Sequence, residues 1–336
     1  MAMDSPTQLL YLTYDGNFQH SCEAVVVHCT FMDPPMDMNK KDDALSKEGK
    51  HSEENITTPN QRWAEIILDR TIFHPQGGGQ PYDKGIILYE NKKAFIDRII
   101  CSRETNIVKH VGFVNLEADD FDSIVSTDSF FPSGSHVLAQ VDVDRRNILS
   151  ECHTAGHVVD AAMARCHEIL PPLKGYHFLD GPYVEYSGNI AVEEREILLP
   201  RLQDAFQVRF ECISCQVSFH NLMLTPPFLH LLSVFTSIYI HVKDVIDENI
   251  GTKIESLTKA QADIVCNRIQ QNFDFSSYGT DEIRIVTVGG WPCPCGGTHV
   301  RSTGMLKGRG WKILDLKCKK GIVRVRYGTN HVNGQS

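Results

Sequence analysis

Two pairs of metal-binding residue types stand at regular spacings in this sequence. His153 and His157 are four positions apart in a segment with helical periodicity, so both imidazoles would lie on one face of a helix. Cys295 and His299 form a second pair, also four positions apart. Imidazole and thiolate ligands together favour zinc over magnesium or calcium. The four residues would form one zinc site if the second pair docks against the helix.

The second pair lies in the segment Trp291-Pro-Cys-Pro-Cys-Gly-Gly-Thr-His299. Its proline and glycine content predicts a tight loop, with Gly296 and Gly297 at positive φ so that the sulfur and the ring point inward together. Cys293 is a second thiol in this loop, and the choice between it and Cys295 stays open. The chain has 15 histidines, so a pair such as His153 and His157 also arises by chance as a packing or surface detail.

The first part of the chain predicts strands separated by turn residues, without a long helical period. This pattern is typical of a small antiparallel β-barrel-like domain or a sandwich. Residues 33–62 carry few large apolar side chains, which predicts a disordered insert. The expected strands are Leu9–Tyr14, Glu23–Phe31, Ala64–Phe73, Gly85–Tyr89, Ala94–Cys101, Ile107–Val111 and Val137–Val143.

The second part alternates helical and extended patterns, which predicts an α+β domain with helices packed on an antiparallel sheet. We place the boundary near residue 145, giving domains at 1–145 and 146–330. Helices are expected at Asn147–Leu170, Val192–Val208 with a bend at Pro200, and Leu257–Asn272. Extended segments are expected at Cys212–Phe219, Ile283–Val288, Trp311–Lys317 and Ile322–Tyr327, the last two joined by a turn at Lys319–Gly321.

Charge is unevenly distributed along the chain. The net charge is −9, but residues 301–326 sum to +8, which leaves −17 for the rest. Such segregation predicts a phosphate-binding face on an acidic protein, and the alternative is a solvated pair of lysine-rich edge strands. The candidate contacts to nucleic acid are Arg301, Lys317, Lys319, Arg324 and Arg326.

Cysteine content and the chain start bear on the cellular compartment. Eleven cysteines in 336 residues are too few for a disulfide scaffold, and the opening Met-Ala-Met-Asp-Ser-Pro lacks a basic start followed by an apolar stretch. The longest apolar stretch, 228–242, is too short to span a bilayer, so we interpret it as core. We expect a reduced cytoplasmic protein that does not bind membranes; its oligomeric state stays open.

Three motifs, which follow one another along the chain in the family's order, resemble a known family. His153xxxHis157 together with Cys295-Gly-Gly-Thr-His299 is similar to the four-ligand signature of the alanyl-tRNA synthetase editing domain, which threonyl-tRNA synthetases and freestanding AlaX-type editing proteins share. Phe73-His-Pro-Gln-Gly-Gly-Gly-Gln80 resembles the glycine-rich motif of the AlaX N-terminal β domain. The resemblance covers roughly residues 8–328, but residues 220–279 and the insert match no pattern of the family.

The resemblance implies a zinc-dependent deacylase acting in trans on mischarged tRNA, with Ser-tRNA(Ala) and Gly-tRNA(Ala) as expected substrates. His153, His157, Cys295 and His299 would bind one Zn²⁺ and form the catalytic centre. Gly77, Gly78, Gly79, Gln80 and Thr298 would bind the substrate. Some members carry a hydroxyl residue that senses serine before the glycine run, and this chain departs from that pattern with Gln76.

Two other functions remain open. A non-catalytic zinc-stabilised module would bind RNA without cleaving it, and a zinc hydrolase of another small ester or amide would leave the basic strands merely solvated. The segment His153–His157 lacks the glutamate that follows the first histidine in HExxH proteases, which disfavours a peptidase. His74 is either catalytic or polar lining. Phe178, Tyr183 and Tyr186 either stack on the terminal adenine or belong to the core.

Overall fold

The computed structural model describes residues 5–35, 61–102, 104–116, 130–206, 245–268 and 273–329, and its N-terminal part is a closed β-barrel. Six antiparallel strands close it in the order β2-β3-β7-β6-β5-β8. Their bounds are Ser21–Met32 (β2), Gln61–Leu68 (β3), Gly85–Tyr89 (β5), Lys92–Cys101 (β6), Val108–Asn115 (β7) and His136–Val141 (β8). This confirms the antiparallel barrel rather than the sandwich.

Alternating apolar residues fill the barrel, as the period of two requires. Ile66, Leu68, Ile87, Val108 and Ala139 are fully buried in its core. The strand predicted at Leu9–Tyr14 is wrong: a short β1 (Gln8–Leu9) pairs with β4 (Arg70–Thr71), and a 3-10 turn (Leu10–Leu12) follows. A short helix α1 (Tyr14–Phe18) comes next, because the Thr13 hydroxyl accepts a hydrogen bond from the Gly16 amide and so caps it.

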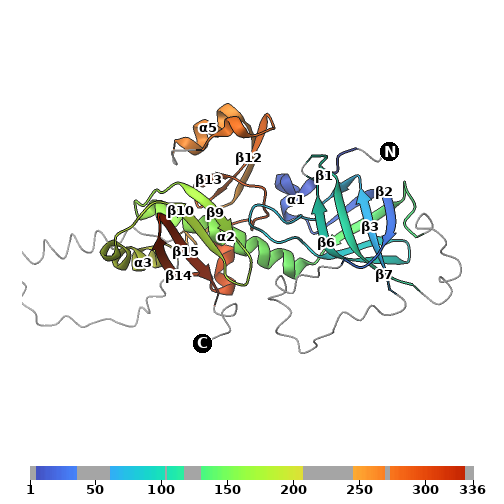
Figure 1. Cartoon of the computed structure of the whole chain (residues 1–336), viewed down its shortest axis with the longest axis horizontal. Helices are drawn as coiled ribbons and strands as arrows, with labels where there is room; N and C mark the ends of the chain where they lie inside the picture. The colour runs from blue at the N-terminus through green and yellow to red at the C-terminus, as the bar shows by residue number, and fades with distance from the viewer. Residues whose placement is uncertain are drawn as a thin grey trace, which may run out of the picture.

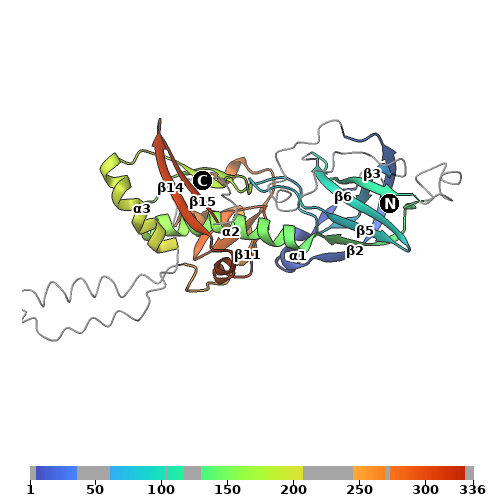
Figure 2. The same cartoon turned by 90° about the horizontal axis from the view of Figure 1, so that it is seen from below.

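Helix α2 (Val143–Arg165) extends from the barrel into the second part of the molecule (Figure 1). Asp142 caps its start by accepting a hydrogen bond from the Arg145 amide. The helix therefore begins four residues earlier than predicted, and it ends at Arg165 rather than Leu170. Pro172 begins a strand instead of merely stopping the helix. The view from below shows the same central course of α2 (Figure 2).

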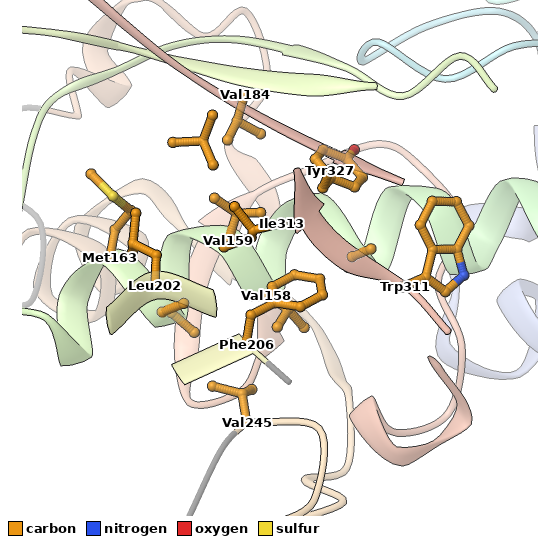
Figure 3. Packing of buried hydrophobic residues seen from close by; sticks show 14 of the residues in the cluster. Val158, Val159, Met163, Val184, Leu202, Phe206, Val245, Trp311, Ile313 and Tyr327 are labelled. Carbon is orange, nitrogen blue, oxygen red and sulfur yellow. The ribbon is translucent and has the colours of Figure 1, made fainter. Parts of the chain in front are cut away.

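A four-stranded antiparallel sheet packs on α2 with its inner face. The order is β14-β15-β10-β9, and helix α3 (Val192–Phe206, with Pro200 inside it) packs on α2 and β14. The strands are Pro172–Tyr176 (β9), Tyr183–Ser187 (β10), Lys312–Lys319 (β14) and Ile322–Gly328 (β15). Figure 3 shows Val158, Met163, Phe206, Ile313 and Tyr327 meeting in this core. The α+β class predicted for this part is confirmed.

A smaller sheet carries the loop of the second ligand pair. Its strands β11 (Lys253–Thr258), β12 (Glu282–Val288) and β13 (Trp291–Pro294) are antiparallel, and α5 (Lys259–Asn267) packs on them. The predicted helix Leu257–Asn272 is therefore shorter, because Thr258 and Gln261 form a capping box that starts it after β11. Trp291–Pro294 is a strand paired with β12, not part of a loop as predicted.

Several predictions fall outside the described residues. These are most of the insert 33–62, the extended segment 212–219, the apolar stretch 228–242 and much of 220–279. Gln61 and Arg62 belong to β3, so the end of the predicted insert is ordered strand. Among the described residues, Cys293 and Cys295 are free thiols, and no helix has the length and apolar character needed to span a bilayer.

Candidate metal centre

The four candidate ligands converge between α2 and the loop after β13. One ligand atom from each of His153, His157, Cys295 and His299 lies within 4.8 Å of the others. The Cys295 sulfur is 3.3 Å from His153 Nε2 and 3.4 Å from His299 Nε2. Cys293 lies outside this group, and its sulfur contacts the Pro294 carbonyl. The donor set could hold a metal ion, and its sulfur and nitrogen atoms fit zinc.

The loop reaches the helix because Gly297 has no side chain. A Cβ at this position would overlap the His153 ring and crowd the Gln80 side chain. Positive φ was expected at Gly296 and Gly297, but neither residue adopts it. That expectation is wrong, because the glycine is needed here for close approach rather than for a left-handed backbone.

Gln80 fixes the orientation of His153. Its side-chain oxygen accepts a hydrogen bond from the Thr298 amide at 2.9 Å and lies 2.7 Å from His153 Nδ1, while its NH₂ group donates to the Thr298 hydroxyl. An amide oxygen can only accept, so Nδ1 must carry the proton and Nε2 is left with its lone pair toward Cys295. Gln80 is fully buried, and all of these side-chain contacts are with His153 and Thr298.

Thr154 plays the same part for His299. The Thr154 hydroxyl donates to the Ser150 carbonyl at 2.7 Å and lies 3.3 Å from His299 Nδ1. Since its single proton is already used, His299 must donate from Nδ1, which again leaves Nε2 available for a metal. The third histidine faces a carboxylate: His157 Nδ1 is 3.8 Å from Asp160, whose other oxygen accepts a 2.5 Å hydrogen bond from the Tyr186 hydroxyl.

Hydrogen bonds that involve Leu12 and Asn17, near the N-terminus, hold the loop from the barrel side. Asn17 donates to the His299 carbonyl at 2.9 Å and accepts from the His299 amide at 3.0 Å. Arg284 donates to the Cys295 carbonyl at 2.5 Å and to the Leu12 carbonyl at 2.7 Å. The candidate centre is therefore assembled from both parts of the chain, although its four ligands all belong to the second part.

Burial keeps the imidazoles neutral. It lowers the pKa of His157 to about 4, and burial together with the neighbouring imidazoles lowers the pKa of His153 and of His299 well below the usual value. The neutral ring is the form that ligates a metal. Burial raises the pKa of the Cys295 thiol, while the Arg284 guanidinium opposes this shift. Burial outweighs this positive charge, so the pKa of the Cys295 thiol remains above its usual value.

The glycine-rich segment is a tight turn anchored by an ion pair. Gly77 and Gln80 exchange backbone hydrogen bonds, and Gly78 and Gly79 adopt φ of 57° and 79°. A few residues further on, Asp83 forms a fully buried ion pair with Arg146 of α2 and accepts a hydrogen bond from the His74 amide. His74 is buried edge-on against the Tyr11 ring, 5.2 Å away, and its Nδ1 has no hydrogen-bond partner. Gln76 is exposed.

His177 is a residue of the site that the sequence did not single out. Its ring stacks on His153 at a centroid distance of 4.2 Å, its Nδ1 lies 2.5 Å from the Tyr327 hydroxyl, and its amide donates to the Gly79 carbonyl. A lone histidine between aromatic residues gives no signal by itself. The only hint is Gly156 inside the helical motif, since a Cβ there would collide with His177 and Tyr327.

The predicted nucleic-acid contacts separate into two places. Lys317, Lys319, Arg324 and Arg326 share the outer face of β14 and β15, whereas Arg301 lies over the Phe18 ring of α1 at 4.3 Å. Lys317 pairs with Asp315, and Arg324 pairs with Glu185, so part of the local charge is neutralised. Lys307 and Arg309 pair with Asp247 and Glu151.

Comparison with known proteins places the chain among synthetase-related sequences. Residues 283–326 match the family "Threonyl and Alanyl tRNA synthetase second additional domain". The chain is 28% identical to alanine–tRNA ligase from Nocardioides sp. over 243 residues, covering 72% of this chain and 21% of that protein. The identity to alanine–tRNA ligase from Methanocorpusculum labreanum is 26% over 271 residues, which cover 78% of this chain and 23% of that protein.

The chain thus spans about a fifth of the length of these relatives. The matched segment contains Cys295, His299 and strands β14 and most of β15. These matches and the strand–helix–sheet order agree with the resemblance drawn from the sequence motifs, and the chain contains an alanyl-tRNA synthetase-related domain.

Proposed function

We propose that this protein hydrolyses the ester bond of mischarged tRNA, with Ser-tRNA(Ala) and Gly-tRNA(Ala) as substrates, at a zinc ion bound by His153, His157, Cys295 and His299. The observation that carries the proposal is the convergence of these four ligand atoms within a domain related to the alanine–tRNA ligases. When bound, zinc can lower the pKa of a coordinated water or polarise an ester carbonyl.

Residues around the centre orient the metal ligands and bind the aminoacyl group in this proposal. Gln80 and Thr154 fix the tautomers of His153 and His299, so that the ligand nitrogens face inward before a metal arrives. The turn Gln76–Gly78 is exposed, and because the Gly77 N–H already donates to the Gln80 carbonyl, we assign the Gly78 N–H to the aminoacyl group. Because the Gln80 amide is occupied by His153 and Thr298, we assign it to ligand orientation rather than to direct contact with the amino acid.

Discrimination against alanine is the demanding step of this proposal. One methyl group in a pocket is worth only about 1–3 kcal/mol, so a hydroxyl partner would improve rejection of Ala-tRNA(Ala). Gln76 is exposed at the turn and is free of the contacts that occupy Gln80. We therefore assign the side chain of Gln76, with the backbone of Gly78, to the amino-acid pocket.

Single-turnover deacylation of Ser-, Gly- and Ala-tRNA(Ala) tests the function. The unmodified protein should hydrolyse Ser-tRNA(Ala) well above Ala-tRNA(Ala), and Gln76→Ala should reduce that ratio without loss of zinc. Competition by uncharged tRNA distinguishes an editing enzyme from a hydrolase of other esters. Equal rates on serine and alanine substrates would instead indicate a general aminoacyl-ester hydrolase.

A second candidate function follows from the ligand count. Four convergent donors can fill the tetrahedral shell of zinc, which is the arrangement of structural sites. The domain would then bind tRNA while the metal only holds the loop to α2. Tight tRNA binding without deacylation of any substrate in the panel would favour this function.

A further inference from the structure

Three aromatic rings form a stack on the outer face of the four-stranded sheet. Tyr176 of β9 and Tyr183 of β10 are register partners with ring centroids 5.1 Å apart and planes 18° from parallel. Phe178 continues the stack beyond Tyr176, at 4.6 Å and 16°. The three residues are half-buried, whereas Val184 and Tyr186 point into the core. Of the aromatics singled out in the sequence, only Tyr186 is a core residue.

Cations surround this stack. The Arg324 guanidinium lies 4.2 Å from the centre of the Tyr183 ring, and Lys174 Nζ lies within 6 Å of both tyrosine rings, at 5.9 and 5.8 Å. Arg326 is the register partner of Tyr183, and Lys317 that of Arg324, so basic residues continue across β15 and β14 on the same face. Glu185 and Asp180 contribute negative charge, and they contact Arg324 and the Tyr176 hydroxyl.

The aromatic stack lies close to the candidate metal centre. His177 stands between Tyr176 and Phe178 in the sequence, but it is buried and stacks on His153. β9 is an edge strand of the sheet, and the glycine-rich turn contacts the end of it through the hydrogen bond from the His177 amide to the Gly79 carbonyl. A polymer lying on the outer face thus has a short route around this edge to the centre.

We propose that Tyr176, Phe178 and Tyr183 form a stacking site for the unpaired nucleotides at the 3′ end of the tRNA acceptor stem. This inference rests on the proposed function and adds the surface that holds the RNA. Bases extend the row of rings by stacking, and the phosphates that join them lie against Lys174, Arg326 and Lys317. Stacking is tolerant of base identity, which suits a tRNA end that carries no distinguishing sequence among tRNAs.

The alternative is that the rings only stabilise the sheet, as cross-strand aromatic pairs do. The barrel provides a matched pair for comparison. Phe95 and Phe113 are register partners of β6 and β7, with centroids 5.2 Å apart and planes 17° from parallel, and Lys93 lies over the Phe95 ring at 5.4 Å. This pair in the barrel has the same stacked rings and the same neighbouring cation as the pair of Tyr176 and Tyr183.

Binding of two acceptor-stem minihelices, one with the unpaired 3′ nucleotides and one blunt, tests the proposal. The probe carries 2-aminopurine in the unpaired segment, so that stacking quenches its fluorescence. Tyr183→Leu and Phe178→Leu keep apolar bulk but cannot stack, and Phe95→Leu is the control. Each stack variant should bind the overhang minihelix about tenfold more weakly and lose the quenching, with unchanged affinity for the blunt one. Phe95→Leu should match the unmodified protein, and zinc content should be equal in all.

The outcomes separate the two levels of the proposal. If the unmodified protein binds both minihelices equally, or if the stack variants bind and quench as it does, the stacking site is overturned while tRNA binding stands. If the unmodified protein binds neither minihelix, both the stacking site and the proposed tRNA substrate are overturned. An equal loss in Phe95→Leu would show that ring removal acts through folding, and it would also overturn the assignment.

Discussion

The side-chain oxygen of Gln80 lies 2.7 Å from Nδ1 of His153, although the two residues are 73 positions apart. One belongs to the glycine-rich turn between barrel strands β3 and β5, and the other to the central helix α2. The contact joins two of the motifs that resemble the synthetase-related family. It also makes the barrel part of the candidate metal centre, although none of the four candidate ligands lies in the barrel.

Replacing Gln80 by Ala should weaken zinc binding. Loss of the amide frees the His153 ring to rotate and leaves a buried Nδ1–H without an acceptor, and outer partners of metal ligands typically contribute about 10- to 100-fold in affinity. Chelator competition measures the effect. Gln76→Ala, in the exposed part of the same turn, is the matched control and should bind zinc normally. Equal affinity in the two variants would contradict the orienting role.

Zinc content should follow the four ligands and not Cys293. The purified protein is expected to hold about one zinc per chain, and His157→Ala should lower occupancy and activity together. Cys293→Ala should keep the metal, since its sulfur lies outside the group, whereas Cys295→Ala should lose it. Metal analysis of the variants gives the answer. Full zinc content in a double His153→Ala, Cys295→Ala variant would remove the site assignment.

Asp160→Asn should reduce zinc affinity about tenfold, because the Asp160 carboxyl lies 3.8 Å from the buried His157 Nδ1, which has no hydrogen-bond partner, and is placed to orient that ring when a metal is bound. Tyr186→Phe should have a smaller effect in the same direction, since it removes the hydroxyl that holds Asp160. Asp144→Asn, exposed in the first turn of α2, is the control. Affinities of Asp160→Asn and Asp144→Asn that agree within error would show that the carboxylate is only a neighbour.

Changing Lys317, Lys319, Arg324 and Arg326 to Gln should weaken tRNA binding and flatten its dependence on salt, because fewer counterions are released on binding. Zinc content should not change. The control is the pair Lys307→Gln, Arg309→Gln, which lies in the 3-10 helix Thr303–Arg309 and not on the outer face of β14 and β15. The measurement is tRNA binding over a series of salt concentrations. If affinity depends on salt equally steeply in the four-residue variant and the unmodified protein, these basic residues are only a solvated surface.

The stability of the metal-free protein should be sensitive to acid. Burial lowers the pKa of His74, His110 and His157 to about 4, against 6.5 in the unfolded chain. Between these pH values the unfolded state binds more protons, so the free energy of unfolding should fall with decreasing pH, by about 1.4 kcal/mol per pH unit for each such histidine.

The Asp160 carboxyl, with its pKa raised by burial to about 7, acts in the opposite direction but is only one group. Urea unfolding of the chelator-treated protein from about pH 6.5 to about pH 4 measures the net slope. Stability that stays constant or rises on acidification over this range would show that the buried imidazoles do not control it.

Local patterns in the sequence determined much of the fold and the identity of the candidate ligands. Alternation of apolar residues located β2, β5, β6, β12, β14 and β15, and helical spacing located α2 and α3. The spacing of four placed His153 and His157 on one face of the helix. These features depend on neighbours a few positions apart, so the order of residues is enough to predict them. The exceptions were the ends of helices, which the capping by Asp142 and Thr258 shifted, the strand predicted at Leu9–Tyr14 and the loop predicted at Trp291–Pro294.

The tertiary structure decided everything that depends on contacts between distant residues. Asn17 and His299 are 282 positions apart, and Cys295 and His153 are 142 apart, yet their pairing selects the sulfur and fixes the loop. The role of Gln80, the stacking of His177 on His153 and the separation of Tyr183 from Tyr186 are of the same kind. A buried donor must find an acceptor wherever the folded chain brings one, and sequence spacing carries no record of that partner.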